Sequence, residues 1–339
     1  MHNGRRRFIF VVALFVGAWV LTSLPIFAAP FQPGQIFIAY DGSNIGVFAD
    51  TVSLAGTQVQ TLSVSTSSFT MATTLSGGGG IALDEQGNLY VTVSNFKNQT
   101  NRRGIIKFNP VGEKVLEIDG KTTTIDFRGL AVSAANDRIY VATDSGIRVW
   151  RASDGTRMSN EDFGGNISFR DVVLDVNGNL YGMHFTTTGN TVYVRKWATG
   201  NFTGSGTLLF SSSGNPDPRA LVLDQDGNLY ITVNTSPIPS IRKFSQAGTL
   251  LATYTAPSGT GTLIGLDYDP GVQKLFASHT ATGSIGQILA LDPKTGSWTA
   301  FGPNNLFGVR WLAVYPTPEP TIAILLAAGW LFLRRRSRR

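Results

Sequence analysis

Short runs in which apolar and polar residues alternate recur along the middle of the chain. In NLYVTV, Leu89, Val91 and Val93 place an apolar side chain at every second position. A period of two predicts a β-strand with one face packed against a neighbour. Similar runs begin at four later positions: Arg138, Asn179, Asn228 and Lys274. The pattern predicts an all-β protein made of many short strands.

An inner apolar segment precedes each of these runs, and it can be aligned in six copies. The copies are GIALD from Gly80, GLAVS from Gly129, DVVLD from Asp171, ALVLD from Ala220, GLDYD from Gly265 and WLAVY from Trp311. Successive copies are 49, 42, 49, 45 and 46 residues apart. A period in the mid-forties fits one four-stranded blade of a β-propeller. Two further strand-like runs around a Gly turn follow in most copies, beginning at Ile105, Ile147, Tyr193, Ile241 and Ile288.

The sixth copy, residues 311–315, has no second strand after it. The missing strands lie at the start of the body, where residues 34–39 match a second strand and residues 45–48 a third. Pairing of the N- and C-terminal strands would close the ring and remove free sheet edges. We therefore predict a six-bladed β-propeller of four-stranded blades over residues 34–316.

A tight turn, LDxxGNLY, joins the first and second strands in three copies. Gly87, Gly178 and Gly227 supply the positive φ that such a hairpin needs. The Asp three positions earlier can accept backbone N–H bonds, so we interpret these carboxylates as structural: Asp84, Asp175 and Asp224. The repeats resemble NHL-type and gluconolactonase-like propeller repeats. That resemblance implies a fold, whereas propellers serve as binding modules, lyases, lactonases and scaffolds.

The first 29 residues have the pattern of an export signal. Arg5, Arg6 and Arg7 precede an apolar run over residues 8–21, and small residues follow at Ala28 and Ala29. A charged start, an apolar middle and a small-residue exit are typical of a signal peptide, here residues 1–29, cleaved near Ala28 or Ala29. An uncleaved N-terminal anchor helix is the alternative.

The other end, residues 317–339, contains Pro318, Glu319 and Pro320, an apolar run over residues 321–333, and a terminal Arg cluster that begins with Arg334, Arg335 and Arg336. A helix of 13 residues spans about 20 Å, short of the roughly 30 Å of a bilayer core. The order of these three parts resembles the PEP-CTERM protein-sorting domain. The alternative is a Pro-rich linker before a C-terminal anchor.

The PEP-CTERM resemblance implies a sorting signal with a short transmembrane helix. It implies recognition by an exosortase-like system in a Gram-negative bacterium that makes extracellular polysaccharide. We therefore expect an exported protein of the cell surface or extracellular matrix, which contacts the membrane only through its terminal segments before they are processed. The export and sorting machinery are its expected partners.

Composition excludes several other classes. The formal net charge of +6 comes from the two ends, which hold eight arginines, while the body between them is close to neutral. A nucleic-acid partner is therefore not expected. The chain has no Cys, which excludes disulfides, thiolate catalysis and Cys-ligated zinc.

An arginine precedes the inner strand in four of the six copies: Arg128, Arg170, Arg219 and Arg310. Their positions predict a ring around one mouth of the central channel. Guanidinium groups suit carboxylate, sulfate or phosphate, so we expect an acidic ligand such as a uronic acid of a polysaccharide. The alternative is that the arginines pair with nearby carboxylates, namely Asp126, Asp171 and Asp217.

Two histidines, His184 and His279, share a register at the ends of second strands. They suggest a metal or an acid/base pair, but packing is favoured because they lie two blades apart on a buried face. No catalytic residue, metal site or cofactor is predicted. The expected function is non-catalytic binding or scaffolding, with polysaccharide or another surface protein as partner. An extracellular lactonase or lyase is the alternative, and a matrix component with no discrete ligand is a third class.

Overall fold

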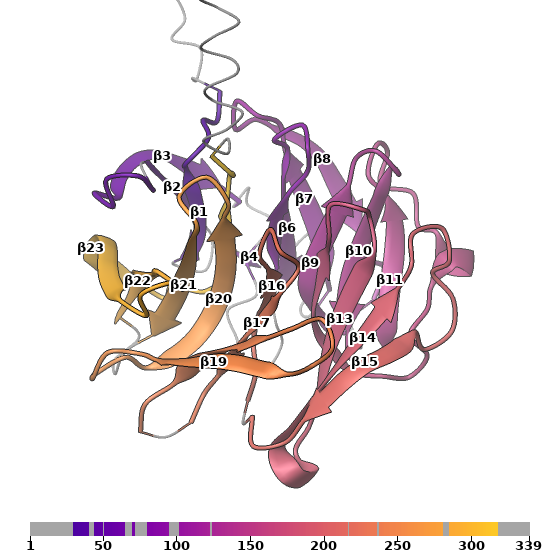
Figure 1. The fold of residues 1–339 in the computed structure, drawn as a ribbon. Coiled ribbons are helices and arrows are strands. Elements are labelled where there is room, and N and C mark those ends of the chain that lie inside the picture. The colour runs from indigo at the N-terminus through magenta and orange to yellow at the C-terminus, as the bar shows by residue number, and fades with distance from the viewer. Residues whose placement is uncertain are drawn as a thin grey trace, which may run out of the picture.

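Six antiparallel sheets are arranged around a central axis in the computed structural model (Figure 1). The structure describes residues 30–40, 44–49, 51–64, 70–71, 80–94, 102–122, 124–215, 217–235, 237–280 and 285–317. The predicted signal peptide and the sorting segment from Pro318 onward, with Glu319, Pro320 and the terminal Arg cluster, lie outside these residues. Within the described ranges there is no helix long and apolar enough to cross a membrane.

The first two blades are formed mainly by the N-terminal strands of the described chain. The first contains, from the axis outward, β24 (Leu312–Val314), β1 (Ile36–Tyr40), β2 (Asn44–Ala49) and β3 (Thr57–Ser63). The second contains β5 (Ile81–Leu83), β6 (Leu89–Ser94), β7 (Gly104–Phe108) and β8 (Lys114–Asp119), and the short β4 (Thr70–Met71) pairs with the far end of β6. The strand β3, whose side chains are mostly exposed, was not recognised from the sequence.

The other four blades follow in chain order. The third contains β9 (Phe127–Ser133), β10 (Arg138–Thr143) and β11 (Gly146–Arg151). The fourth contains β12 (Phe169–Leu174), β13 (Leu180–Thr186), β14 (Thr191–Trp197) and β15 (Thr207–Ser212). The fifth contains β16 (Leu221–Leu223), β17 (Leu229–Val233), β18 (Ser240–Phe244) and β19 (Leu250–Thr255). The sixth contains β20 (Thr262–Asp269), β21 (Lys274–Thr280), β22 (Ile285–Leu291) and β23 (Trp298–Phe307). The prediction of an all-β, six-bladed propeller is confirmed.

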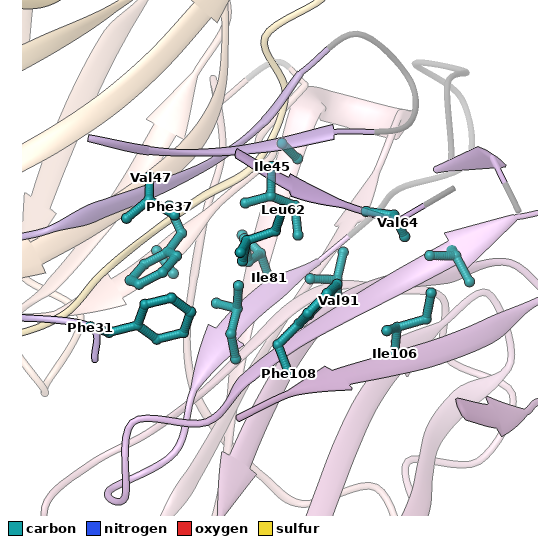
Figure 2. Close-up of a cluster of buried hydrophobic side chains, with 14 residues drawn as sticks. Phe31, Phe37, Ile45, Val47, Leu62, Val64, Ile81, Val91, Ile106 and Phe108 are labelled. Atoms are coloured by element: carbon teal, nitrogen blue, oxygen red, sulfur yellow. The ribbon is translucent and has the colours of Figure 1, made fainter. Parts of the chain in front are cut away.

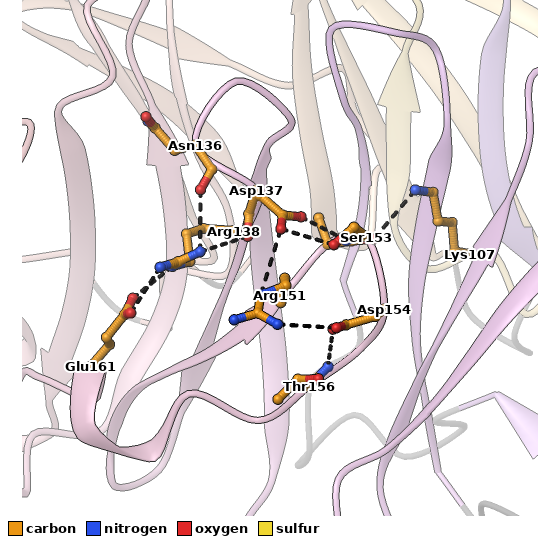
Figure 3. A network of polar contacts seen from close by, with 10 residues as sticks. Lys107, Asn136, Asp137, Arg138, Arg151, Ser153, Asp154, Thr156 and Glu161 are labelled. Atoms are coloured by element: carbon orange, nitrogen blue, oxygen red, sulfur yellow. Dashed lines mark hydrogen bonds and ion pairs between the residues drawn. The ribbon is translucent and has the colours of Figure 1, made fainter.

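The third blade differs in its outermost segment, which pairs with β11 only through two isolated bridges, Ile147 with Phe163 and Trp150 with Arg157. Backbone hydrogen bonds also join the two, such as that from the Met158 N–H to the Val149 carbonyl at 2.9 Å. Side chains fasten this segment further, as part of the polar network in Figure 3. Glu161 accepts two hydrogen bonds from Arg138, at 2.6 and 2.8 Å, and this ion pair supplements the incomplete ladder.

Each pair of neighbouring blades encloses its own apolar cluster, six in all among the described residues. Figure 2 shows the cluster between the first two blades, where Phe37 and Val47 face Val91 and Phe108. Successive residues on a strand point to opposite faces. In LDxxGNLY, Leu therefore packs against the preceding blade and Tyr against the following one, as Leu229 and Tyr230 do.

The turn carboxylates are structural, as predicted. Asp224 Oδ1 accepts the N–H groups of Asp226 (3.0 Å) and Asn228 (2.8 Å), and its Oδ2 accepts the Asn228 amide (2.9 Å) and the Tyr230 hydroxyl (3.1 Å). Gly227 has φ 75°, a left-handed conformation that favours glycine. Asp84 and Asp175 accept the same set of bonds.

The ring closes where β24 pairs with β1, with Leu312 opposite Ile38. Asp269, the turn carboxylate of the sixth blade, is fully buried at this seam. It accepts the Thr51 hydroxyl at 2.8 Å, and the backbone N–H and hydroxyl of Thr317 at 3.0 and 2.7 Å. One carboxylate of the sixth blade therefore bonds both the segment after β2 and the segment after β24.

We predict that Asp224→Ala lowers the free energy of unfolding by about 2–3 kcal/mol, because buried polar groups of the turn and Tyr230 lose their acceptor. The matched control is Asp226→Ala in the same turn, whose side chain is exposed. That change should stay within about 0.5 kcal/mol. Urea unfolding of both variants measures the difference, and equal losses would contradict the structural role of Asp224.

Candidate functional site: the arginine mouth of the channel

A cavity of about 440 Å³ runs along the propeller axis and is lined by the inner strands of all six blades. Gly129, Asp171, Ala220 and Trp311 are among its lining residues. Each of these directly follows one of the four predicted arginines in the sequence. The arginines therefore lie at the end of the inner strands where the cavity begins.

Two of the arginines lie in irregular positions inside strands rather than before them. Arg128 is the second residue of β9 and Arg170 the second residue of β12. The strand register shifts at both places, so that residues 128–129 face one residue of β10, and Arg170 lies between the paired Phe169 and Asp171. Such β-bulges re-aim side chains and are common at the edges of functional sites.

The other two arginines precede their strands, as predicted, and their backbones are held from the second strand of the blade. The backbone N–H groups of Arg219 and Ala220 both donate to the Thr232 hydroxyl, at 2.9 and 3.0 Å. The Arg310 N–H donates to the carbonyl of Ala39 at 2.9 Å. These contacts involve only the backbone of the two arginines.

Of the three carboxylates that were alternative partners, one pairs with an arginine of the mouth. Asp217 pairs with Arg219 at 2.6 Å. Asp126 pairs with Arg103 instead. Asp171 accepts the backbone N–H of Leu221, on the next inner strand, at 2.8 Å.

The side chains of Arg128 and Arg170 have hydrogen-bond donors that lack acceptors among the described residues. Arg128 Nη1 donates to the Ser168 hydroxyl (2.7 Å) and the Phe169 carbonyl (2.9 Å), while its buried Nε has no hydrogen-bond partner among the described residues. The Arg170 side chain makes no hydrogen bond or ion pair with any residue that the structure describes. A partly buried guanidinium without an acceptor is costly, and an anion would relieve that cost.

The four guanidinium groups also affect one another. Burial lowers the pKa of Arg170, the charges of Arg128 and Arg219 lower it further, and the charge of Asp217 raises it. Burial likewise lowers the pKa of Arg310, with a second contribution from Arg219. The arginines thus repel one another, while Asp217 offsets part of this effect at Arg170, and Asp144 and Asp126 offset part of it at Arg128.

Two carboxylates lie deeper, in the channel wall, and one of them was missed from the sequence. Asp171 and Asp267 both line the cavity, and each carboxylate accepts a backbone N–H from the neighbouring inner strand: Leu221 for Asp171 and Val314 (2.7 Å) for Asp267. Burial raises the pKa of both to about 7. The signal available in the sequence was an Asp inside an apolar inner segment. Gly129 makes room for one of them, since a Cβ there would lie 1.7 Å from Asp171 Oδ1.

The two histidines are packed, as predicted. His184 stacks on Tyr193 with ring centroids 4.7 Å apart, and burial followed by the charge of Arg195 lowers its pKa to about 4. His279 is 6% exposed, and burial lowers its pKa. Among the described residues there is no group of three His, Asp or Glu side chains that could hold a metal ion.

Comparison with known proteins supports the fold and leaves the function open. No protein-family model matches the chain, and no curated protein sequence matches it. A chain of the nidogen/laminin complex is similar in structure, with 15% identity and a TM-score of 0.58 over 84% of this chain and 99% of that one. A protein of unknown function from Bacteroides caccae has 11% identity and a TM-score of 0.54 over 83% and 98%. Kuenenia stuttgartiensis hydrazine synthase has 14% identity and a TM-score of 0.51 over 68% of each chain.

We predict that the channel carboxylates make the protein less stable as the pH rises. The folded pKa of about 7 for Asp171 exceeds the value of about 3.9 expected in the unfolded chain. Between these values the folded state holds a proton that the unfolded state has lost, so stability falls from about pH 4 to about pH 7.

The variant Asp171→Asn removes one titrating group and keeps an acceptor for Leu221. Its stability relative to the parent, measured by urea unfolding, should therefore improve between pH 5 and pH 8. Comparison with the parent cancels the effect of His184, whose lowered pKa acts in the opposite direction. A difference that stays constant with pH would contradict the raised pKa of Asp171.

Proposed function

We propose that this protein is an exported, non-catalytic propeller that binds an acidic polysaccharide at the arginine mouth, defined as Arg128, Arg170, Arg219 and Arg310. The observation that carries the proposal is Arg170, whose side chain lies near the charges of Arg128, Arg219 and Asp217 and makes no hydrogen bond or ion pair with any described residue. Sugar carboxylates or sulfates would supply the acceptor that the Arg170 guanidinium lacks.

The proposed setting is the cell surface or extracellular matrix. It is supported by the sequence patterns of residues 1–29 and of residues 317–339, whose Pro318-Glu319-Pro320 motif, apolar run and Arg cluster resemble an exosortase-processed sorting domain. A matrix rich in acidic polysaccharide would bring this ligand to the mouth. Another acidic surface protein would offer the same chemistry, and it is the second candidate partner.

A catalytic role is the runner-up, and one observation favours it. Asp171 and Asp267 line the cavity with pKa values of about 7, within the range that suits general acid–base catalysis near neutral pH. Both carboxylates are, however, already engaged with backbone N–H groups of the inner strands. Lactonase or lyase chemistry therefore has less support than binding.

Titration of the protein with oligogalacturonate, monitored by isothermal titration calorimetry, tests the binding proposal. We expect Arg170→Ala and Arg219→Ala each to weaken binding roughly 10-fold or more, because a hydrogen bond to a charged group contributes about 1.5–3 kcal/mol. Binding should also weaken as salt is added.

The matched control is Arg151→Ala, which removes the same charge from an exposed ion pair with Asp154. Arg151 is the last residue of β11 and lies at the end of that strand far from the mouth. This control variant should leave the affinity unchanged. A neutral oligosaccharide of the same length should not bind. Equal affinities for all variants, or no binding by the parent protein, would contradict the proposal.

A further inference from the structure

The two ends of the described chain leave the propeller side by side. The N–H of Gly34 donates to the carbonyl of Tyr315, and the N–H of Tyr315 donates to the carbonyl of Gln35, both at 2.8 Å. A Cβ built on Gly34 would lie 3.1 Å from Thr317 Cγ2. Figure 1 shows both ends at the top of the view, while the loop between β13 and β14 lies at the bottom.

This exit lies on the face opposite the arginine mouth. The chain enters β24 at Arg310, in the mouth, and leaves it at Tyr315, beside the turns that carry Asp269. Seven residue steps separate Arg310 from Thr317, and at the rise of a β-strand they span about 23 Å. The exit and the mouth are thus separated by the length of the inner strands.

The connection from this exit to the C-terminal apolar run is short. Thr317 is held by two hydrogen bonds to Asp269, and the apolar run begins at Thr321, after Pro318, Glu319 and Pro320. Four residue steps reach at most about 14 Å, however extended they are. That reach is less than the axial distance to the mouth alone, before any path around the outer strands is added.

We propose that the propeller meets the membrane with its turn face, the face of the LDxxGNLY turns, and holds the arginine mouth away from the lipid. The partner is a lipid bilayer that takes up the C-terminal apolar run. The proposal rests on the membrane contact expected for the terminal segments, and it is independent of what the mouth binds. A mouth that faces away from the membrane stays open to polymer in the surrounding matrix for as long as the tail is anchored.

The experiment uses the absence of Cys in the chain. Two single-Cys variants of the full chain, Thr295→Cys and Ser258→Cys, each carry a bimane fluorophore. Both positions are exposed, and the two replaced side chains are similar in size. Thr295 lies in the turn between β22 and β23 on the turn face, and Ser258 lies in the connection from β19 to β20 on the mouth face. Both lie at the boundary of the fifth and sixth blades, since Ser258 connects the two blades and a Cβ on Gly296, next to Thr295, would lie 3.8 Å from Tyr254 of the fifth blade. The pair therefore compares the two faces.

The labelled proteins are bound to phosphatidylethanolamine/phosphatidylglycerol vesicles that contain a headgroup nitroxide lipid. We expect a strong loss of fluorescence for the label at residue 295 and almost none at residue 258, relative to vesicles without nitroxide. Equal losses, or a larger loss at residue 258, would overturn the proposed orientation. Failure of the full chain to sediment with vesicles would also overturn it, while the oligosaccharide titration would be unaffected.

Discussion

A carboxylate enclosed in a tight turn couples the local structure of three blades to the core between blades. The oxygen atoms of Asp224 accept backbone N–H groups of its own turn together with the hydroxyl of Tyr230. That hydroxyl bond fixes the direction of a ring that is fully buried between the fifth and sixth blades. Lys243 lies over the same ring, 5.1 Å from its centroid, and 3.2 Å from the carboxylate. The turn and the packing of the next blade therefore depend on the same side chain.

The blades that lack this arrangement show what takes its place. In the sixth blade, Asp269 bonds to Thr51 and Thr317, which belong to the first blade and its exit, so the turn carboxylate serves the closure of the ring. In the third blade the corresponding residue is Ser133, whose hydroxyl accepts a single backbone N–H at 3.3 Å. That blade also has the irregular outer segment held by ion pairs. In this blade the ion pair of Arg138 with Glu161 therefore adds to the attachment of the outer segment.

The sequence predicted the features that depend on local signals. The period of the repeat, the Gly-Asn turns and the closing strand all follow from short patterns of apolar residues and glycines. The strand β3, with the sequence TQVQTLS, was not predicted, because most of its side chains are exposed and its sequence shows no clear alternation of apolar and polar residues.

The finer parts of the site depend on distant contacts that no local pattern contains. Asp126 is two residues from Arg128, yet it pairs with Arg103, on the preceding blade. The bulge at Arg170 is visible only from the register of β12 against β13. Asp267 was noted only as part of a strand, because its partner, the N–H of Val314, comes from the last strand of the chain.

The two ends of each inner strand are subject to different physical demands. At the turn end, the side chains build the fold, so their identity is constrained. At the mouth end, the strand starts are held by hydroxyl groups of the second strand, such as Thr92, Thr232 and Ser278, which bond to backbone N–H groups. The backbone at the mouth is therefore held without the arginine side chains, although Arg128 and Arg219 also bond within the protein. Placing several arginines there costs stability through mutual repulsion and burial, and the fold gains nothing that explains Arg170. A cost of this kind is typical of sites where function opposes stability, which supports the proposed external anion at Arg170, while Arg219 is already paired with Asp217.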